Sequence, residues 1–90
     1  MNTSAPEPDP RALRVSVTED DLTVHLHDGR VLSVPLVWFP RLVQATPAQR
    51  ENHRLIGEGD GVHWPDLNED VSVRGLLRGW ASGETVPRAG

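Results

Sequence analysis

The sequence contains no cysteine, no lysine and no tyrosine, and only four of its 90 residues are aromatic. The absence of cysteine excludes disulfides and thiolate metal sites, and it fits a reducing compartment. No segment approaches the roughly 18 apolar residues that a membrane-spanning helix requires. The opening MNTSAPEPDPR lacks the basic start and the apolar run of a secretion signal. We therefore expect a cytoplasmic protein without a membrane partner.

Charge is the next informative property, because the chain has a net charge of −4 and every basic residue is an arginine. An acidic balance argues against a broad nucleic-acid-binding surface. Residues 35–56 carry three arginines against Glu51, whereas residues 57–70 carry five carboxylates and no arginine. The acidic segment is either a solvated loop or a complement to a basic protein partner, and both interpretations stay open.

The length fits one small domain. A core of this size is marginal unless it is well packed or shared with a partner, so a homo-oligomer is compatible with the sequence. Three prolines in APEPDP and few apolar residues predict a disordered tail over residues 1–11. We expect a single domain over residues 12–80 and a frayed C-terminus over residues 81–90.

Alternation of apolar and polar residues predicts three half-buried strands near the N-terminus. A two-residue loop at Glu19–Asp20 and a three-residue loop at His27–Gly29 keep the apolar faces of an antiparallel meander together. In the second loop, Gly29 fits the left-handed position of a type I turn followed by a bulge. The residues expected on the apolar face are Leu13, Val15, Val17, Leu22, Val24, Leu26, Leu32 and Val34.

The rest of the chain predicts shorter elements. A short helix begins near Pro40, and Thr46 with Gln49 forms a capping box that opens a helix over residues 47–53. Residues 54–57 and 62–64 are expected to be extended, with a glycine-rich turn between them. Ser72 caps a final helix with an apolar stripe at Val73, Leu76, Leu77 and Trp80. The predicted fold class is α+β: a three-stranded antiparallel meander followed by short helices, an extra short strand or hairpin, and a C-terminal helix.

No pattern in the sequence indicates an enzyme or a cofactor. The serines lack an activating nucleophile motif, and no phosphate-binding loop or paired-carboxylate pattern is present. His63, Asp66, Glu69 and Asp70 offer nitrogen and oxygen donors for a metal. Pro65 disfavours the helix that would align them, and a second histidine is missing. We predict no catalytic residues, no metal and no cofactor.

The three tryptophans have two possible uses. In a domain this small, Trp38 and Trp64 are expected to contribute to the core, where each buries on the order of 200 Å². For Trp80, close to the C-terminus, core and interface are equally compatible with the sequence.

The run from Asp28 to Gly79 resembles the bacterial family of domains of unknown function numbered 2442. The residues that carry the resemblance are Asp28-Gly29-Arg30, Pro40-Arg41-Leu42, Arg54-Leu55-Ile56-Gly57, Gly61-Val62-His63-Trp64-Pro65, Glu69-Asp70 and Gly75-Leu76-Leu77. The resemblance covers residues 13–79 and implies a small α+β domain associated with toxin–antitoxin systems. His53 departs from the family pattern, which favours tryptophan at this position.

Together these features predict a non-enzymatic protein-interaction module, the antitoxin-like half of a toxin–antitoxin pair. The acidic segment 58–70 and an aromatic patch would mask a basic toxin. One alternative is a DNA-binding or regulatory domain, so nucleic acid stays open as a partner; a metal-binding protein or small enzyme using His63, Asp66 and Asp70 ranks below it. The DNA-binding alternative acts through Arg41, Arg50 and Arg54. The candidate interaction surface comprises Trp38, Arg41, Arg50, Arg54, His63, Trp64, Asp66, Glu69, Asp70 and Trp80.

Overall fold

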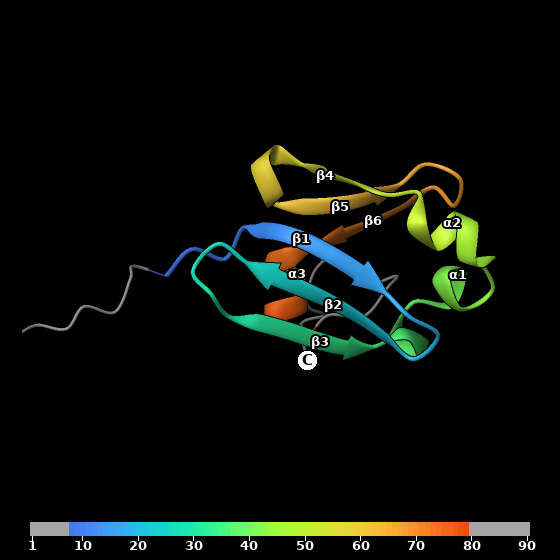
Figure 1. The fold of residues 1–90 in the computed structure, drawn as a ribbon, viewed down its shortest axis with the longest axis horizontal. Coiled ribbons are helices and arrows are strands. Elements are labelled where there is room, and N and C mark those ends of the chain that lie inside the picture. Colours follow the sequence, from blue (N-terminus) through green and yellow to red (C-terminus); the bar gives the residue numbers. More distant parts are fainter. Residues whose placement is uncertain (1–7, 80–90) are drawn as a thin grey trace, which may run out of the picture.

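The computed structural model describes residues 8–79, which form two three-stranded antiparallel sheets with short helical segments (Figure 1). The first sheet has the order β1-β2-β3 and the second the order β4-β5-β6. The strands are β1 (Ala12–Val17), β2 (Asp21–Leu26), β3 (Val31–Pro35), β4 (Arg54–Ile56), β5 (Gly61–Trp64) and β6 (Glu69–Ser72). The predicted α+β class and the N-terminal meander are confirmed.

The helical segments are all short. Three of them follow β3 and precede β4 in the sequence, and these three lie together at one end of the molecule, on the right in Figure 1. They are η1 (Leu36–Trp38), α1 (Pro40–Val43) and α2 (Pro47–Glu51). The 3-10 turn η2 (Gly57–Gly59) joins β4 to β5, and α3 (Val73–Arg78) follows β6. Within the described part of the chain, no helix has the length and apolar character that a membrane crossing requires.

Both predicted loops of the first sheet are confirmed by its register. Val17 of β1 pairs with Leu22 of β2, and Val24 of β2 pairs with Leu32 of β3. The three-residue loop depends on Gly29, whose φ of +95° is a conformation that few other residues adopt. The alternation of apolar side chains was therefore sufficient to place the register of β2 and β3.

The start of β1 differs from the prediction, because the register between β1 and β2 shifts at Leu13. Ala12 pairs with Leu26 and is buried, whereas Leu13 is bulged out of the ladder and is 50% exposed. The expectation that Leu13 shares the apolar face of Val15 and Val17 is wrong. An extra residue in one strand turns the side chains before it to the opposite face.

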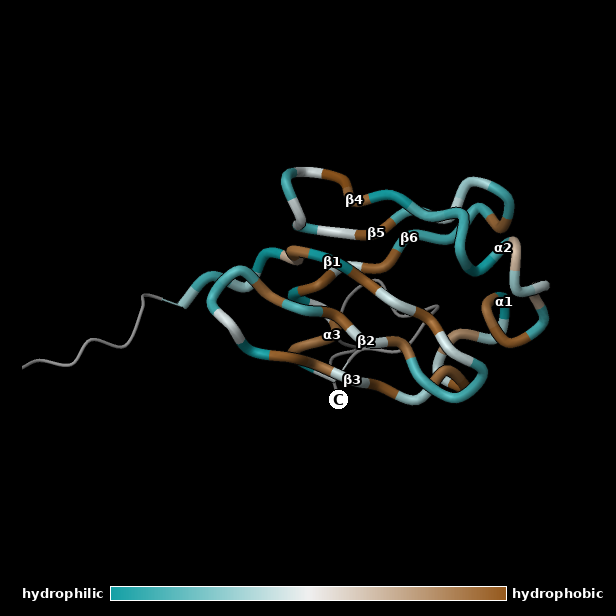
Figure 2. The backbone as a smooth tube through the Cα atoms, viewed as in Figure 1, coloured by the Kyte–Doolittle hydropathy of each residue, from teal (hydrophilic) through white to brown (hydrophobic). Residues whose placement is uncertain are grey.

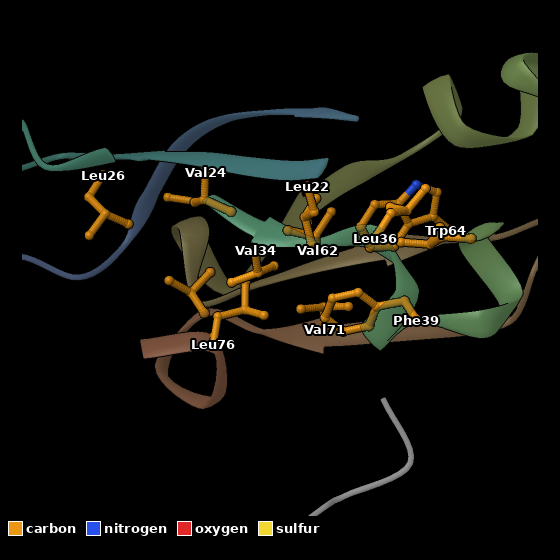
Figure 3. Close-up of a cluster of buried hydrophobic side chains, with 13 residues drawn as sticks. Leu22, Val24, Leu26, Val34, Leu36, Phe39, Val62, Trp64, Val71 and Leu76 are labelled. Atoms are coloured by element: carbon orange, nitrogen blue, oxygen red, sulfur yellow. The ribbon is translucent and has the colours of Figure 1, made fainter. Parts of the chain in front are cut away.

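The core lies between the two sheets, where side chains from β2 and β3 meet side chains from β5, β6 and α3 (Figure 3). Trp64 is the largest side chain in it and is completely buried. Its indole Nε1 donates a hydrogen bond of 3.0 Å to the Arg50 backbone oxygen, which satisfies its only polar group. The prediction that Trp64 belongs to the core is confirmed, and Trp38 packs against the core from a partly buried position.

Local signals in the sequence place the helix starts correctly. Thr46 Oγ1 accepts a hydrogen bond from Gln49 N at 3.1 Å, and Gln49 Oε1 accepts one from Thr46 N at 2.9 Å, which confirms the capping box. The helix ends at Glu51 rather than at residue 53, because Asn52 has a ψ of 80° and leaves the helical conformation. Ser72 Oγ accepts from Gly75 N at 3.1 Å at the start of α3, as predicted.

The apolar stripe predicted for the last helix is only partly buried. Val73 and Leu76 are in the core, whereas Leu77 is 39% exposed. The helix stops at Arg78, followed by Gly79 in the left-handed conformation. Trp80 and the predicted C-terminal segment 81–90 lie outside the described residues, as do residues 1–7 of the predicted tail.

Residues 8–11 contact two turns of the domain. Asp9 N donates to Asp28 Oδ2 at 2.7 Å, and Arg11 Nη1 donates to Glu58 Oε1 at 3.3 Å. Arg11 also donates from its side chain to Asp9, which holds the pKa of the Asp9 carboxyl well below its usual range. The boundary predicted at residue 12 stays a prediction.

The second sheet is larger than the predicted extra strand or hairpin, because residues 69–72 form a third strand in it. Val62 pairs with Val71, and both side chains are buried on the face that meets the first sheet. Glu69 pairs with Trp64 and is also buried, at 6% exposure. In β6 the charged residue Glu69 occupies a position that faces the core. The alternation of apolar and polar residues that would have identified this strand is therefore absent from the sequence.

Candidate functional site

The second sheet has one face in the core and one face exposed. Leu55, Val62 and Val71 are in register across the three strands, and Val62 and Val71 are buried. Because successive side chains in a strand point to opposite faces, the residues on either side of them lie on the exposed face. We call this surface the outer face; it comprises Arg54, Ile56, Gly61, His63, Asp70 and Ser72.

A cleft of about 280 Å³ opens on the outer face. Gly61 lies at its centre, paired with Ile56 on one side and Ser72 on the other. A Cβ atom at Gly61 would lie 3.0 Å from the Val71 backbone oxygen and 3.2 Å from Ile56 Cγ1, so the Ile56 side chain packs over Gly61 and leaves little room for a larger residue there. We call this the outer cleft; it is lined by Ile56, Gly57, Asp60, Gly61, Asp70, Val71 and Ser72.

Strand β4 borders the outer cleft and is an edge strand, since among residues 8–79 it pairs only with β5. Its last two residues, Leu55 and Ile56, are 37% and 38% exposed. Figure 2 shows this hydrophobic stretch in brown at the end of β4. An edge strand leaves backbone N–H and C=O groups unpaired on one side, which is the feature that extended peptides use when they bind to a sheet.

The ionisable groups on the outer face and at the rim of the outer cleft are two carboxylates, one histidine and one arginine. His63 Nδ1 and Asp70 Oδ1 form a direct cross-strand contact, in which the ring nitrogen donates to the carboxylate. Asp60, immediately before Gly61, is exposed and makes no side-chain hydrogen bond or ion pair within residues 8–79. Arg54 is exposed at the opposite end of β4 and pairs in register with His63. The outer cleft therefore has carboxylates at its rim and mostly apolar walls.

Two of the three arginines proposed to contact DNA have structural roles instead. Arg50 donates from Nε to the Leu42 oxygen at 2.8 Å and from Nη2 to the Val43 oxygen at 2.9 Å, where it satisfies the last carbonyls of α1. Arg41 Nη1 donates to the Asn68 oxygen at 2.8 Å and lies 3.8 Å from Glu69 Oε1. These guanidinium groups hold α1 and the β5–β6 turn in place.

Two other residues of the predicted surface are not available to a partner. Trp64 and Glu69 are buried, so their inclusion in the candidate interaction surface is wrong, whereas the expectation that Trp64 contributes to the core is confirmed. Glu69 points inward because its pairing with Trp64 places both side chains on the core face of the sheet. His53, the departure from the family pattern, packs its ring 5.6 Å from the Trp64 ring and donates from Nδ1 to the Arg50 oxygen.

The four residues considered as metal ligands are dispersed. His63 contacts Asp70, whereas Asp66 accepts a hydrogen bond of 3.0 Å from Asn52 Nδ2 and Glu69 lies on the other face. Across residues 8–79, no three histidine or carboxylate side chains come close enough together to hold a metal ion.

The prediction from sequence missed the residues that form the outer cleft, namely Ile56, Asp60 and Gly61. The signal was present in GVHW, where Val62 and Trp64 alternate inward with Gly61 and His63 outward. A glycine inside a strand often marks a place where another group approaches the backbone closely, and here that group is the Ile56 side chain. The turn before it was interpreted only as a connection between two extended pieces.

Comparison with known proteins identifies the family. The description "Protein of unknown function (DUF2442)" matches residues 12–82, which is most of the chain. The chain belongs to the DUF2442 family. No functionally curated protein matches this DUF2442 domain.

Two solved structures resemble this DUF2442 domain. The crystal structure of a protein of unknown function from Rhodospirillum rubrum has a TM-score of 0.70 and 26% sequence identity, and the match covers 82% of this chain and 92% of that one. The solution structure of an uncharacterized protein from Chromobacterium violaceum has a TM-score of 0.69 and 28% identity, covering 83% of this chain and 70% of that one. The two-sheet fold is thus shared by proteins whose roles are not described.

Proposed function

We propose that this DUF2442 domain is a non-enzymatic protein-interaction module that acts in the cytoplasm as the antitoxin-like partner of a basic protein. The observation that carries the proposal is the outer face of the second sheet. It combines an exposed edge strand, the exposed side chain of Ile56, and a cleft with carboxylates at its rim. The family resemblance implies an association with toxin–antitoxin systems, which favours a toxin as the partner.

The mechanism is steric and electrostatic masking. Asp60 and Asp70 attract basic side chains of the partner. The apolar end of β4 then packs against the apolar surface of the partner that surrounds those basic side chains. This mechanism differs from the one predicted from sequence, because Asp60 and Asp70 are exposed while Glu69 and Trp64 are buried. Ser72, the serine on the outer face, accepts a hydrogen bond from Gly75 N and caps α3. This structural role does not support a role for Ser72 as a nucleophile.

Co-expression with the protein encoded by the neighbouring gene tests the proposal. The expected result is a stable one-to-one complex by size-exclusion chromatography and relief of the growth arrest that the neighbouring protein causes when expressed alone. Absence of both a complex and a rescue would contradict the proposal. An electrophoretic shift of promoter DNA by the isolated chain, steeply weakened by salt, would favour the regulatory alternative instead.

A further inference from the structure

The outer cleft lies beside Gly61, a buried residue over which the Ile56 side chain packs. Gly61 lies between Ile56 and Ser72 in the middle of the outer face, and the adjacent wall is the Ile56 side chain. The volume of about 280 Å³ exceeds what one water molecule occupies and is close to the lower limit for ligand-binding pockets. The cleft can therefore accommodate a single long side chain but not a large ligand.

The charge of the cleft is negative on two sides. Asp60 precedes Gly61 at one end of the cleft, and Asp70 lies on the neighbouring strand with its side chain 68% exposed. His63 contacts one carboxylate oxygen of Asp70, and the charge of Asp60 interacts with the Arg11 guanidinium. Arg54, the arginine of the outer face, is in register with His63 rather than with Gly61. The exposed carboxylates at the rim therefore offer hydrogen-bond acceptors to a partner.

We infer that the outer cleft binds one arginine side chain, presented by an extended segment of the partner that lies alongside β4. The inference deepens the proposed function and rests on it. An arginine has a planar guanidinium with five N–H donors, which can reach carboxylates on two sides at once. Its methylene stem packs on apolar surface, and the exposed Ile56 side chain at the cleft wall provides that surface. A segment alongside β4 pairs with the open edge of the sheet.

The blocked tripeptide acetyl-Thr-Arg-Thr-amide is the direct probe, with acetyl-Thr-Lys-Thr-amide and acetyl-Thr-Gln-Thr-amide as comparisons. Titration of the isotope-labelled chain, followed by amide chemical shifts, is expected to give saturable changes centred on Gly57, Gly61 and Ser72. Affinity for the arginine peptide is expected to be on the order of millimolar, because one side chain and a short backbone provide little contact. The lysine peptide is expected to bind more weakly, and the glutamine peptide weakest.

The variant Asp60→Asn/Asp70→Asn removes both charges while keeping the side-chain shapes. It is expected to weaken arginine-peptide binding by about fivefold, since exposed ion pairs are individually weak. Glu19→Gln/Asp20→Asn is the matched control, because it removes two carboxylates from the exposed β1–β2 turn at the opposite end of the molecule (Figure 1). Ile56→Arg is a second test, since it places a competing positive charge at the cleft wall and is expected to abolish saturable shifts.

Equal affinity for the arginine and glutamine peptides, shifts located away from the outer cleft, or unchanged binding by both cleft variants would overturn the inference. The neighbouring protein then separates the two proposals. A complex that forms with unchanged affinity for Asp60→Asn/Asp70→Asn and Ile56→Arg would remove the arginine cleft and leave the proposed function intact. A wild-type chain that binds the arginine peptide but not the neighbouring protein would remove the proposed partner instead.

Discussion

Gly59 provides a sharp test of how the two sheets are joined. This glycine has a φ of +103° and is buried against the start of β1, where an added Cβ would lie 2.4 Å from the Ala12 oxygen and 2.8 Å from the Ala12 nitrogen. Both atoms are backbone, so no side-chain rotation can relieve the overlap. In Gly59→Ala, η2 and β1 must move apart for the domain to stay folded.

Gly29 offers a matched control, since its φ is +95° and an added Cβ would meet no heavy atom within 4 Å. Both alanine variants bear the left-handed strain of about 1–2 kcal/mol. Both also gain the same stabilisation from a less flexible unfolded chain. Only Gly59→Ala adds the overlap, which costs about 1–3 kcal/mol when a packed contact must open. We expect Gly59→Ala to be less stable than Gly29→Ala by about that difference.

Urea unfolding followed by far-ultraviolet circular dichroism measures the difference directly. For a domain of this size, each 1 kcal/mol lowers Tm by roughly 4–8 °C, so thermal unfolding gives a second estimate. Equal stabilities of the two variants would refute the close contact between η2 and β1, and with it the position of the outer cleft relative to the first sheet.

Three further predictions concern the core, the acid stability and the helix cap. Trp64→Phe removes the hydrogen bond to the Arg50 oxygen and part of a completely buried ring; we expect a loss of about 2–3 kcal/mol in urea unfolding, and a loss under about 1 kcal/mol would contradict the packing. Hydrogen bonds from the Arg30 side chain and the Asp9 backbone lower the pKa of Asp28 from 3.8 to about 2. A carboxyl group with a lowered folded-state pKa stabilises the fold above its unfolded pKa, so stability should fall as the pH drops from about 4 to about 2. Asp28→Asn should be less stable at neutral pH and should lose less over that interval; an unchanged acid limb of the urea midpoint would count against this. Thr46→Ala should lower stability by about 1 kcal/mol, with faster hydrogen exchange confined to α2, and uniform acceleration across both sheets would argue against a local cap.

The sequence was sufficient where one local rule determines the conformation. Alternation placed the register of β2 against β3, and Gly29 identified the three-residue loop. Side-chain oxygens at Thr46 and Ser72 identified two helix starts. In each case the interacting residues are close in the chain, so no knowledge of the tertiary structure was needed.

The errors arose where contacts distant in sequence determine the outcome. Leu13 leaves the core because a bulge lets Ala12 enter it and contact η2. Glu69 turns inward because it pairs with Trp64, and that pairing is visible only once β6 is placed in the sheet. Arg41 and Arg50 donate hydrogen bonds to backbone carbonyls of other segments of the chain, which no local pattern in the sequence predicts. The outer cleft was missed because its lining residues come from all three strands of the second sheet and from the turn before β5, and these meet only in the folded domain.

The most direct test of the account is the affinity of the purified chain for the protein encoded by the neighbouring gene, measured at increasing salt. The account predicts a one-to-one complex that weakens as salt rises, because charges on the outer face contribute to it. Asp60→Asn/Asp70→Asn should weaken the complex further and reduce its salt dependence, while Glu19→Gln/Asp20→Asn leaves both unchanged. Absence of a complex at low salt would contradict the proposed function. If the wild-type chain and the two double variants bound the neighbouring protein with the same affinity and salt dependence, that result would contradict the role of the outer face.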